Sequence, residues 1–224
     1  MYVKVKINKN DVYMNLTKKF IRFLFILAVV FTTVSTFNLA TVAATTKENS
    51  QKQLTPHQLE ELNKKLEEIR IDINEQLASG QENVFASRDL SFSDEPLVMA
   101  FNTTESVNVK NNSSISLAAV QQRKAFSGYV ANNYPAAGFK HSVSGSFLYG
   151  SGKVGTYSYD AYLTGPLYSK SHKTSATRLD PSVVRVTSNG TFKALKYSPV
   201  EYNTRVVIEL YGSGTYRVIT ARIN

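Results

Sequence analysis

The last hundred residues alternate between apolar and polar side chains, and this period of two constrains the fold more than any other feature. The alternation is clearest in residues 139–149 and 157–163, and glycine-containing breaks follow at 150–152, 165–166 and 212–214. Successive side chains of a strand point to opposite faces, so each such segment predicts a strand with one apolar face. Asn189-Gly190 adds the signal of a two-residue hairpin. We expect about seven or eight antiparallel strands in a β-sandwich or barrel, and hence a mostly β fold.

One long amphipathic helix is predicted ahead of this β region. Thr55 can cap it, Pro56 suits its first position, and Gly80 can end it. Leucine and isoleucine recur at spacings of three and four and share one stripe: Leu59, Leu62, Leu66, Ile69, Ile73 and Leu77. Such a stripe needs a partner, and docking on the β region is the simplest one.

The first 44 residues have the organisation of a signal peptide. Lys18, Lys19 and Arg22 precede an apolar run at 23–37, and Ala44 ends a small-residue cleavage motif. The run is shorter than the roughly 20 residues that span a bilayer, which favours cleavage after Ala44 over a membrane anchor. Translation starting at Met14 would explain the preceding residues. We therefore expect a secreted, extracellular protein. Its lack of cysteine is commoner among Gram-positive bacterial secretions than among eukaryotic ones.

Charge divides the remaining chain into two segments. Residues 45–122 carry 7 basic and 12 acidic residues, a net charge of −5, whereas residues 123–224 carry 13 basic and 4 acidic residues, a net charge of +9. This asymmetry predicts an acidic docking segment or pro-region with a linker at 45–122, and a basic β domain at 123–224. For an exported protein, the anionic partner predicted is membrane lipid or cell-wall polymer rather than nucleic acid.

No catalytic, cofactor or metal motif is evident in the β domain. It contains four carboxylates, Asp160, Asp180, Glu201 and Glu209, and none has the setting of a glycosidase pair or a metal site. No nucleophile elbow is present, and His141 alternates with core residues, which predicts a buried structural histidine. The sequence thus predicts a protein that is not an enzyme and needs no cofactor.

The stretch "GPLYSKSHKTSATRLD" at 165–180 is the most polar and basic part of the β domain. Period two places Tyr168, Lys170, His172 and Arg178 on one face, with neither face apolar enough for a central strand. One interpretation is an edge strand protected by lysines. The other is a basic, aromatic strip that binds an anionic surface through these four residues.

The segments "YPAAGFKHSVSGSFLYGSGKV" and "YSKSHKTSAT" resemble large secreted bacteriocin-like proteins of the geobacillin type. The run "SHKTSAT" is also similar to a strand of lactococcin-type β-sandwich bacteriocins. This resemblance implies inhibition of related bacteria at their envelope. We therefore expect a non-enzymatic antimicrobial or envelope-active protein, with a wall-binding or carbohydrate-binding surface module that does not kill as the alternative.

Overall fold

The computed structural model describes residues 53–109, 121–132, 138–194 and 200–224. The described chain contains one helix, α2 (Pro56–Ala78), followed by nine strands. The strands are β1 (Asn83–Leu90), β2 (Ser93–Val109), β3 (Gln121–Asn132), β4 (Phe139–Gly150), β5 (Lys153–Thr164), β6 (Tyr168–Asp180), β7 (Val183–Ala194), β8 (Glu201–Tyr211) and β9 (Tyr216–Ile223). The signal peptide predicted for residues 1–44 lies outside the described residues. No described helix is long and apolar enough to cross a membrane.

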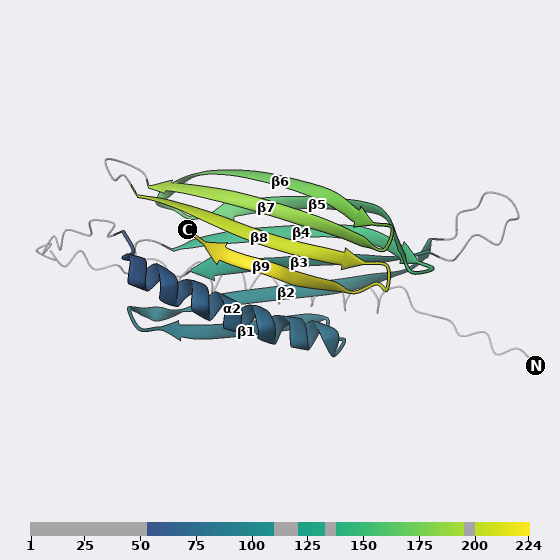
Figure 1. The fold of residues 1–224 in the computed structure, drawn as a ribbon, viewed down its shortest axis with the longest axis horizontal. Coiled ribbons are helices and arrows are strands. Elements are labelled where there is room, and N and C mark those ends of the chain that lie inside the picture. The colour runs from purple at the N-terminus through teal and green to yellow at the C-terminus, as the bar shows by residue number, and fades with distance from the viewer. Residues whose placement is uncertain (1–52, 110–120, 133–137, 195–199) are drawn as a thin grey trace, which may run out of the picture. The chain divides into compact units, whose positions relative to one another are not determined.

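The strands form two antiparallel sheets, which is consistent with a β-sandwich and confirms the mostly β prediction. The five-stranded sheet has the order β1-β2-β3-β4-β5 and the four-stranded sheet the order β6-β7-β8-β9. Within each sheet, every strand pairs with its neighbours in the chain, and the meander passes from one sheet to the other between β5 and β6 (Figure 1). Turns at Ser151-Gly152 and Gly214 adopt positive φ angles, as the glycine-containing breaks predict.

The division at residue 122 that the charge pattern predicts is not a boundary of the fold. Strand β2 pairs with β3 from Leu97↔Asn132 to Val109↔Gln121, so the two sides of that division belong to one sheet. The alternation in β2 is hard to recognise because Val98 and Ala100 face outward while Thr103 faces the core, where it is 8% exposed. Residues 110–120, which include most of the predicted linker, lie outside the described residues.

The hairpin predicted at Asn189-Gly190 is wrong. Both residues lie inside β7, where Gly190 pairs with His172 on one side and Thr204 on the other. A Cβ atom on Gly190 would lie 2.6 Å from Thr204 Oγ1 and 2.9 Å from Leu163 Cδ2. The glycine is therefore required by close packing between the sheets, not by a turn.

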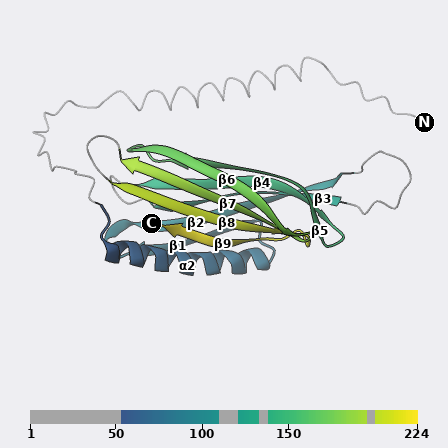
Figure 2. The same cartoon turned by 45° about the horizontal axis from the view of Figure 1, so that its top comes forward.

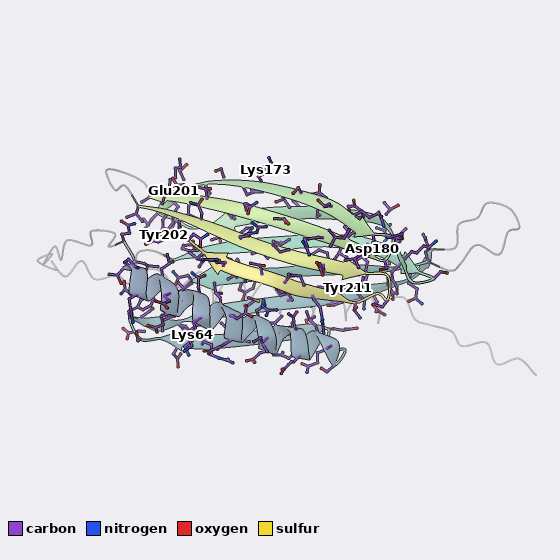
Figure 3. The ribbon with its side chains drawn as sticks, in the orientation of Figure 1. Lys64, Lys173, Asp180, Glu201, Tyr202 and Tyr211 are labelled. Atoms are coloured by element: carbon purple, nitrogen blue, oxygen red, sulfur yellow. The ribbon has the colours of Figure 1, made fainter. Side chains whose placement is uncertain are left out.

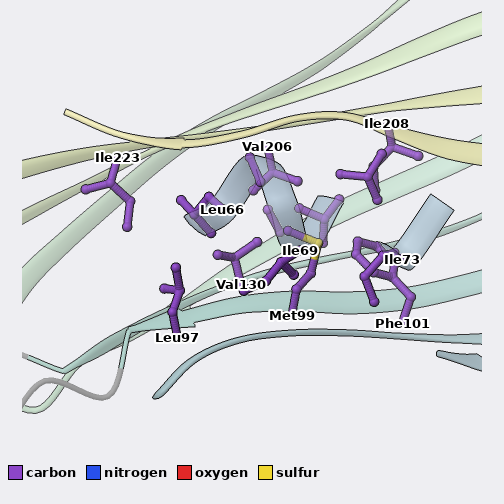
Figure 4. Packing of buried hydrophobic residues seen from close by; sticks show 14 of the residues in the cluster. Leu66, Ile69, Ile73, Leu97, Met99, Phe101, Val130, Val206, Ile208 and Ile223 are labelled. Carbon is purple, nitrogen blue, oxygen red and sulfur yellow. The ribbon is translucent and has the colours of Figure 1, made fainter. Parts of the chain in front are cut away.

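Helix α2 begins with a capping box. Thr55 Oγ1 accepts a hydrogen bond from the Gln58 backbone N–H at 3.3 Å, and the Gln58 side chain accepts one from the Thr55 N–H at 2.8 Å. Leu62, Leu66, Ile69 and Ile73 are all 0% exposed. Figure 4 shows Leu66, Ile69 and Ile73 between Val206, Ile208 and Ile223 on one side and Leu97, Met99 and Phe101 on the other. The apolar stripe thus completes the core between the two sheets.

The helix also covers one edge of each sheet, because it lies alongside β9 and β1 (Figure 2). Asn63 donates to the Ile223 carbonyl at 2.7 Å and accepts from the Ile223 N–H at 3.0 Å. Asn74 makes the same pair of bonds to Val218 at 2.8 and 2.9 Å, and Gln76 makes it to Phe85 on β1 at 3.0 and 3.2 Å. Three side-chain amides therefore satisfy edge backbone groups that would otherwise be open to pairing.

Candidate functional site

The residues predicted to form a surface strip lie on β6, which is the edge strand of the four-stranded sheet. Tyr168 is only 3% exposed and packs against Phe139, Phe192 and Tyr202, so it is a core residue that cannot contact an external surface in this conformation. Burial, together with the neighbouring Tyr202, raises the pKa of its hydroxyl far above the usual value. The aromatic member of the predicted strip must therefore be removed from it.

The two cations of that strip are exposed but bind backbone carbonyls. Lys170 Nζ donates to the carbonyls of Gly165 at 2.9 Å and Tyr168 at 3.2 Å. Arg178 donates to the carbonyls of Val154 at 2.7 Å and Gly155 at 3.0 Å, both on β5, and lies 5.6 Å from the ring centre of Tyr157. The Arg178 contacts join the end of β6 to the start of β5, at the far end of these strands from the connection at 165–167, so Arg178 acts as a clasp between the two sheets.

A hydrogen-bonded network of polar side chains runs from His172 into the core. His172 Nδ1 lies 3.3 Å from Thr174 Oγ1, which lies 2.9 Å from Ser188 Oγ. Ser188 Oγ lies 2.8 Å from His141 Nε2, and His141 Nδ1 lies 2.8 Å from Thr204 Oγ1. His141 comes from β4, whereas its partners come from β7 and β8, so its imidazole links the two sheets. The prediction that His141 is buried is confirmed, since it is 1% exposed.

The hydrogen bond made by Thr204, at the inner end of the network, fixes the position of the protons. Thr204 Oγ1 donates to the Gly190 carbonyl at 3.3 Å, and it therefore accepts the proton of His141 Nδ1. His141 Nε2 is then the acceptor of the Ser188 hydroxyl, and every group is satisfied by the neutral imidazole. Burial, with a smaller contribution from His172, lowers the pKa of His141 to about 4. The Ser188–His141 pair resembles a nucleophile with its base, but Ser188 is 0% exposed and out of reach of any substrate in this conformation.

The outer face of the four-stranded sheet carries a row of cations that sequence reasoning did not bring together. The register pairs Lys173 with Asn189, Asn189 with Arg205, and Arg205 with Arg222. All four side chains are exposed, and Lys173 projects away from the ribbon in Figure 3. We call these four residues the basic row. Within residues 53–109, 121–132, 138–194 and 200–224, no ion pair joins any of its three cations to an acid.

The basic row lies between two rows without charge. Their members are hydroxyl, amide and aliphatic residues: Ser171, Thr191 and Asn203 on one side, and Ser175, Thr187, Val207 and Thr220 on the other. Of the next cations, Arg185 and Lys193 are paired with acids, because Arg185 Nη2 lies 2.5 Å from Glu209 and Lys193 Nζ lies 3.4 Å from Glu201. Arg217 stands opposite Glu209 in the register and forms no ion pair among the described residues. Arg205 and Arg222 stand directly opposite each other, an arrangement that destabilises a sheet unless something else compensates it.

Alternation along each strand is the only sequence signal for the basic row. It identifies Arg205 as solvent-facing and puts Lys173 on the face of its strand opposite His172 and Arg178. The alignment of three strands cannot be obtained from it, since a shift of one residue in register would send a side chain to the other face.

Other candidate sites are weaker. A cavity of about 280 Å³ at the C-terminal end of α2 is lined by Leu77, Thr103, Tyr216 and neighbouring residues, which is small for an organic ligand. Among the described residues, no group of three or more histidine, aspartate or glutamate side chains could hold a metal ion. Four carboxylates of α2 have partners within the helix or near β1. Glu67 pairs with Arg70, Glu68 and Asp72 pair with Arg88, and Glu61 accepts hydrogen bonds from Ser91.

No family model, no curated protein and no solved structure matches this chain.

Proposed function

We propose that this is an exported, envelope-active protein that binds an anionic cell surface through the outer face of its four-stranded sheet. The observation that supports the proposal is the basic row. Lys173, Arg205 and Arg222 are exposed, aligned across the strands and not neutralised by any described acid. Their mutual repulsion is relieved when an anionic lipid or wall polymer lies across them.

The helix leaves this surface accessible. Its amides bind the backbone edges of β9 and β1, and three of its carboxylates, Glu67, Glu68 and Asp72, pair with Arg70 and Arg88. We therefore regard α2 as a part of the folded module that orients it, and not as a mask over the cations.

Binding to anionic vesicles tests the proposal. Each cation close to an anionic surface contributes on the order of 1 kcal/mol, so the double variant Arg205→Gln, Arg222→Gln should weaken binding about 30-fold at low salt. Raising the salt concentration should also weaken binding of the unaltered protein, because exposed charges are screened.

A matched control removes the same charge elsewhere. The double variant Lys170→Gln, Arg178→Gln alters the cations that already bind carbonyls, and it should weaken binding much less. Equal losses in the two double variants, or binding that does not respond to salt, would contradict the proposal.

Killing is the finer part of the proposal and follows from the bacteriocin-like resemblance. A spot assay against related bacteria separates the two candidates: clearing of the lawn supports an antimicrobial protein, whereas bound but viable cells support a wall-binding or carbohydrate-binding surface module.

A further inference from the structure

The opposite face of the molecule carries a row of aromatic side chains across the five-stranded sheet. The register pairs Phe85 with Ala100, Ala100 with Tyr129, Tyr129 with Ser142, and Ser142 with Tyr162. Inward neighbours such as Val84, Ala86 and Leu163 are buried, so these five side chains share the outer face. We call them the aromatic row.

Two of its rings are unusually open to solvent. Phe85 is 58% exposed and Tyr162 is 67% exposed, although large apolar rings are normally covered. Tyr129, between them, is partly covered by Lys140, whose Nζ lies 4.3 Å from the ring centre. Because the Lys140 side chain is flexible, a ligand can displace it from the ring.

The three positions that carry the rings are evenly spaced across the sheet. One strand lies between Phe85 and Tyr129 and another between Tyr129 and Tyr162, so the backbones at these positions are about 10 Å apart at the usual strand spacing. An extended β-1,4-linked glycan presents the same face of a sugar at every second unit, with a comparable repeat. Three rings at this spacing therefore match alternate sugars of one chain, since the apolar face of a sugar stacks on an aromatic ring.

The surroundings of the row suit an uncharged, hydroxyl-rich ligand. One flanking row consists of Asn83, Asn102, Ser127, Ser144 and Asp160. The other consists of Ser87, Val98, Ala131, Lys140 and Thr164, and Val98 and Ala131 are only 7% and 5% exposed, so the amides and hydroxyls are concentrated in the first row. The two rows contain one acid and one base, so the charges beside the aromatic row balance. A polyanion is favoured by the basic row on the other sheet, whereas amides and hydroxyls beside exposed rings complement the polar edges of sugars.

We infer that the aromatic row is a binding platform for an extended β-1,4-linked glycan, held by stacking on Phe85, Tyr129 and Tyr162. The site is independent of the basic row and stands if the anionic-surface proposal fails. With both sites active, the module links a glycan on one face to an anionic surface on the other.

Calorimetric titration of the purified protein with the hexamer of N-acetylglucosamine tests this inference. Loss of one stacking ring should raise Kd by up to about tenfold, so Tyr162→Ala and Phe85→Ala should each weaken binding and their combination should weaken it further. Tyr162→Phe keeps the ring and should retain binding. Ile71 lies on the helix and is 45% exposed. Ile71→Ala is therefore the matched apolar control and should have no effect.

Three results would overturn the inference. They are no saturable binding of the hexamer, binding unaffected by Tyr162→Ala, or equal binding of the coiled α-1,4-linked maltohexaose. If the row instead joins two copies of the chain, light scattering will show a dimer that Tyr162→Ala dissociates, and the hexamer will not bind. Binding that persists at about 0.5 M sodium chloride, where charge interactions are screened, separates this site from the basic row.

Discussion

The two open sides of the β-sandwich are closed in different ways. Between β9 and β1 the side is filled by α2, whose apolar stripe enters the core and whose amides bind both sheet edges. Between β5 and β6 it is closed by the Arg178 clasp, with the polar network from His172 to His141 beside it. One side therefore depends on buried apolar area, whereas the other depends on polar and titratable groups.

A core substitution on the helix side should cause the largest loss of stability. Ile69 is 0% exposed between the two sheets, and Ile69→Ala should lower the free energy of unfolding by about 2–5 kcal/mol because it leaves a cavity. Ile71, two residues away on the exposed face, provides the control, since Ile71→Ala should stay within about 0.5 kcal/mol. Urea denaturation measures both, and similar losses in the two variants would remove the distinction between the two sides.

The polar side should respond to acid. Above the usual histidine pKa of 6.5, His141 is neutral whether the chain is folded or not. As the pH falls below 6.5, His141 becomes protonated in the unfolded chain, whereas in the folded protein it stays neutral down to its pKa of about 4. Stability therefore decreases over this pH range. The loss should approach about 3 kcal/mol near pH 4 and then level off.

Two measurements check this acid response. NMR titration of the imidazole should give the depressed pKa directly, and His141→Gln should abolish this part of the pH dependence while His57→Gln preserves it. An imidazole that titrates near 6.5, or an unchanged pH dependence in His141→Gln, would show that the network does not couple folding to pH.

The smallest difference in stability is expected when side-chain hydrogen bonds to backbone groups are removed on the two sides. Asn74→Ala removes both hydrogen bonds to Val218 at the covered edge of β9, and it should cost about 1–3 kcal/mol because those backbone groups lose their partners. Arg178→Ala removes donors from the Val154 and Gly155 carbonyls. It should cost less than about 1 kcal/mol, because the Gly155 bond is exposed and no backbone N–H loses its partner. Thermal unfolding of both variants gives the order, and the reverse order would mean that the clasp, not the helix, secures the edges.

Much of the fold could be predicted because it depends on local patterns. The spacing of the apolar residues and the Thr55 cap predict the segment that forms α2, and alternation identifies His141 as inward-facing. The hairpin predicted at Asn189-Gly190 is wrong because glycine is also selected by close packing, here against Thr204 and Leu163. A local turn motif contains no information on such packing. The sequence leaves residues 97–101 open as one strand or a segment packed on the core, and the structure places them in β2. Alternation is weak in β1 and β2 because the faces opposite the core carry apolar residues such as Phe85 and Val98.

The candidate surfaces depend on tertiary structure. Alternation shows which face of its own strand Lys173, Arg205 or Tyr162 occupies, but it contains no information on which residue of the next strand lies opposite. Register results from turn lengths and from packing of the opposite, buried face. The sequence by itself determined a basic, strand-rich chain with one amphipathic helix. Only the folded sheets decided that the cations align on one outer face and the exposed aromatic rings on the other, because both rows are made of residues far apart in the chain.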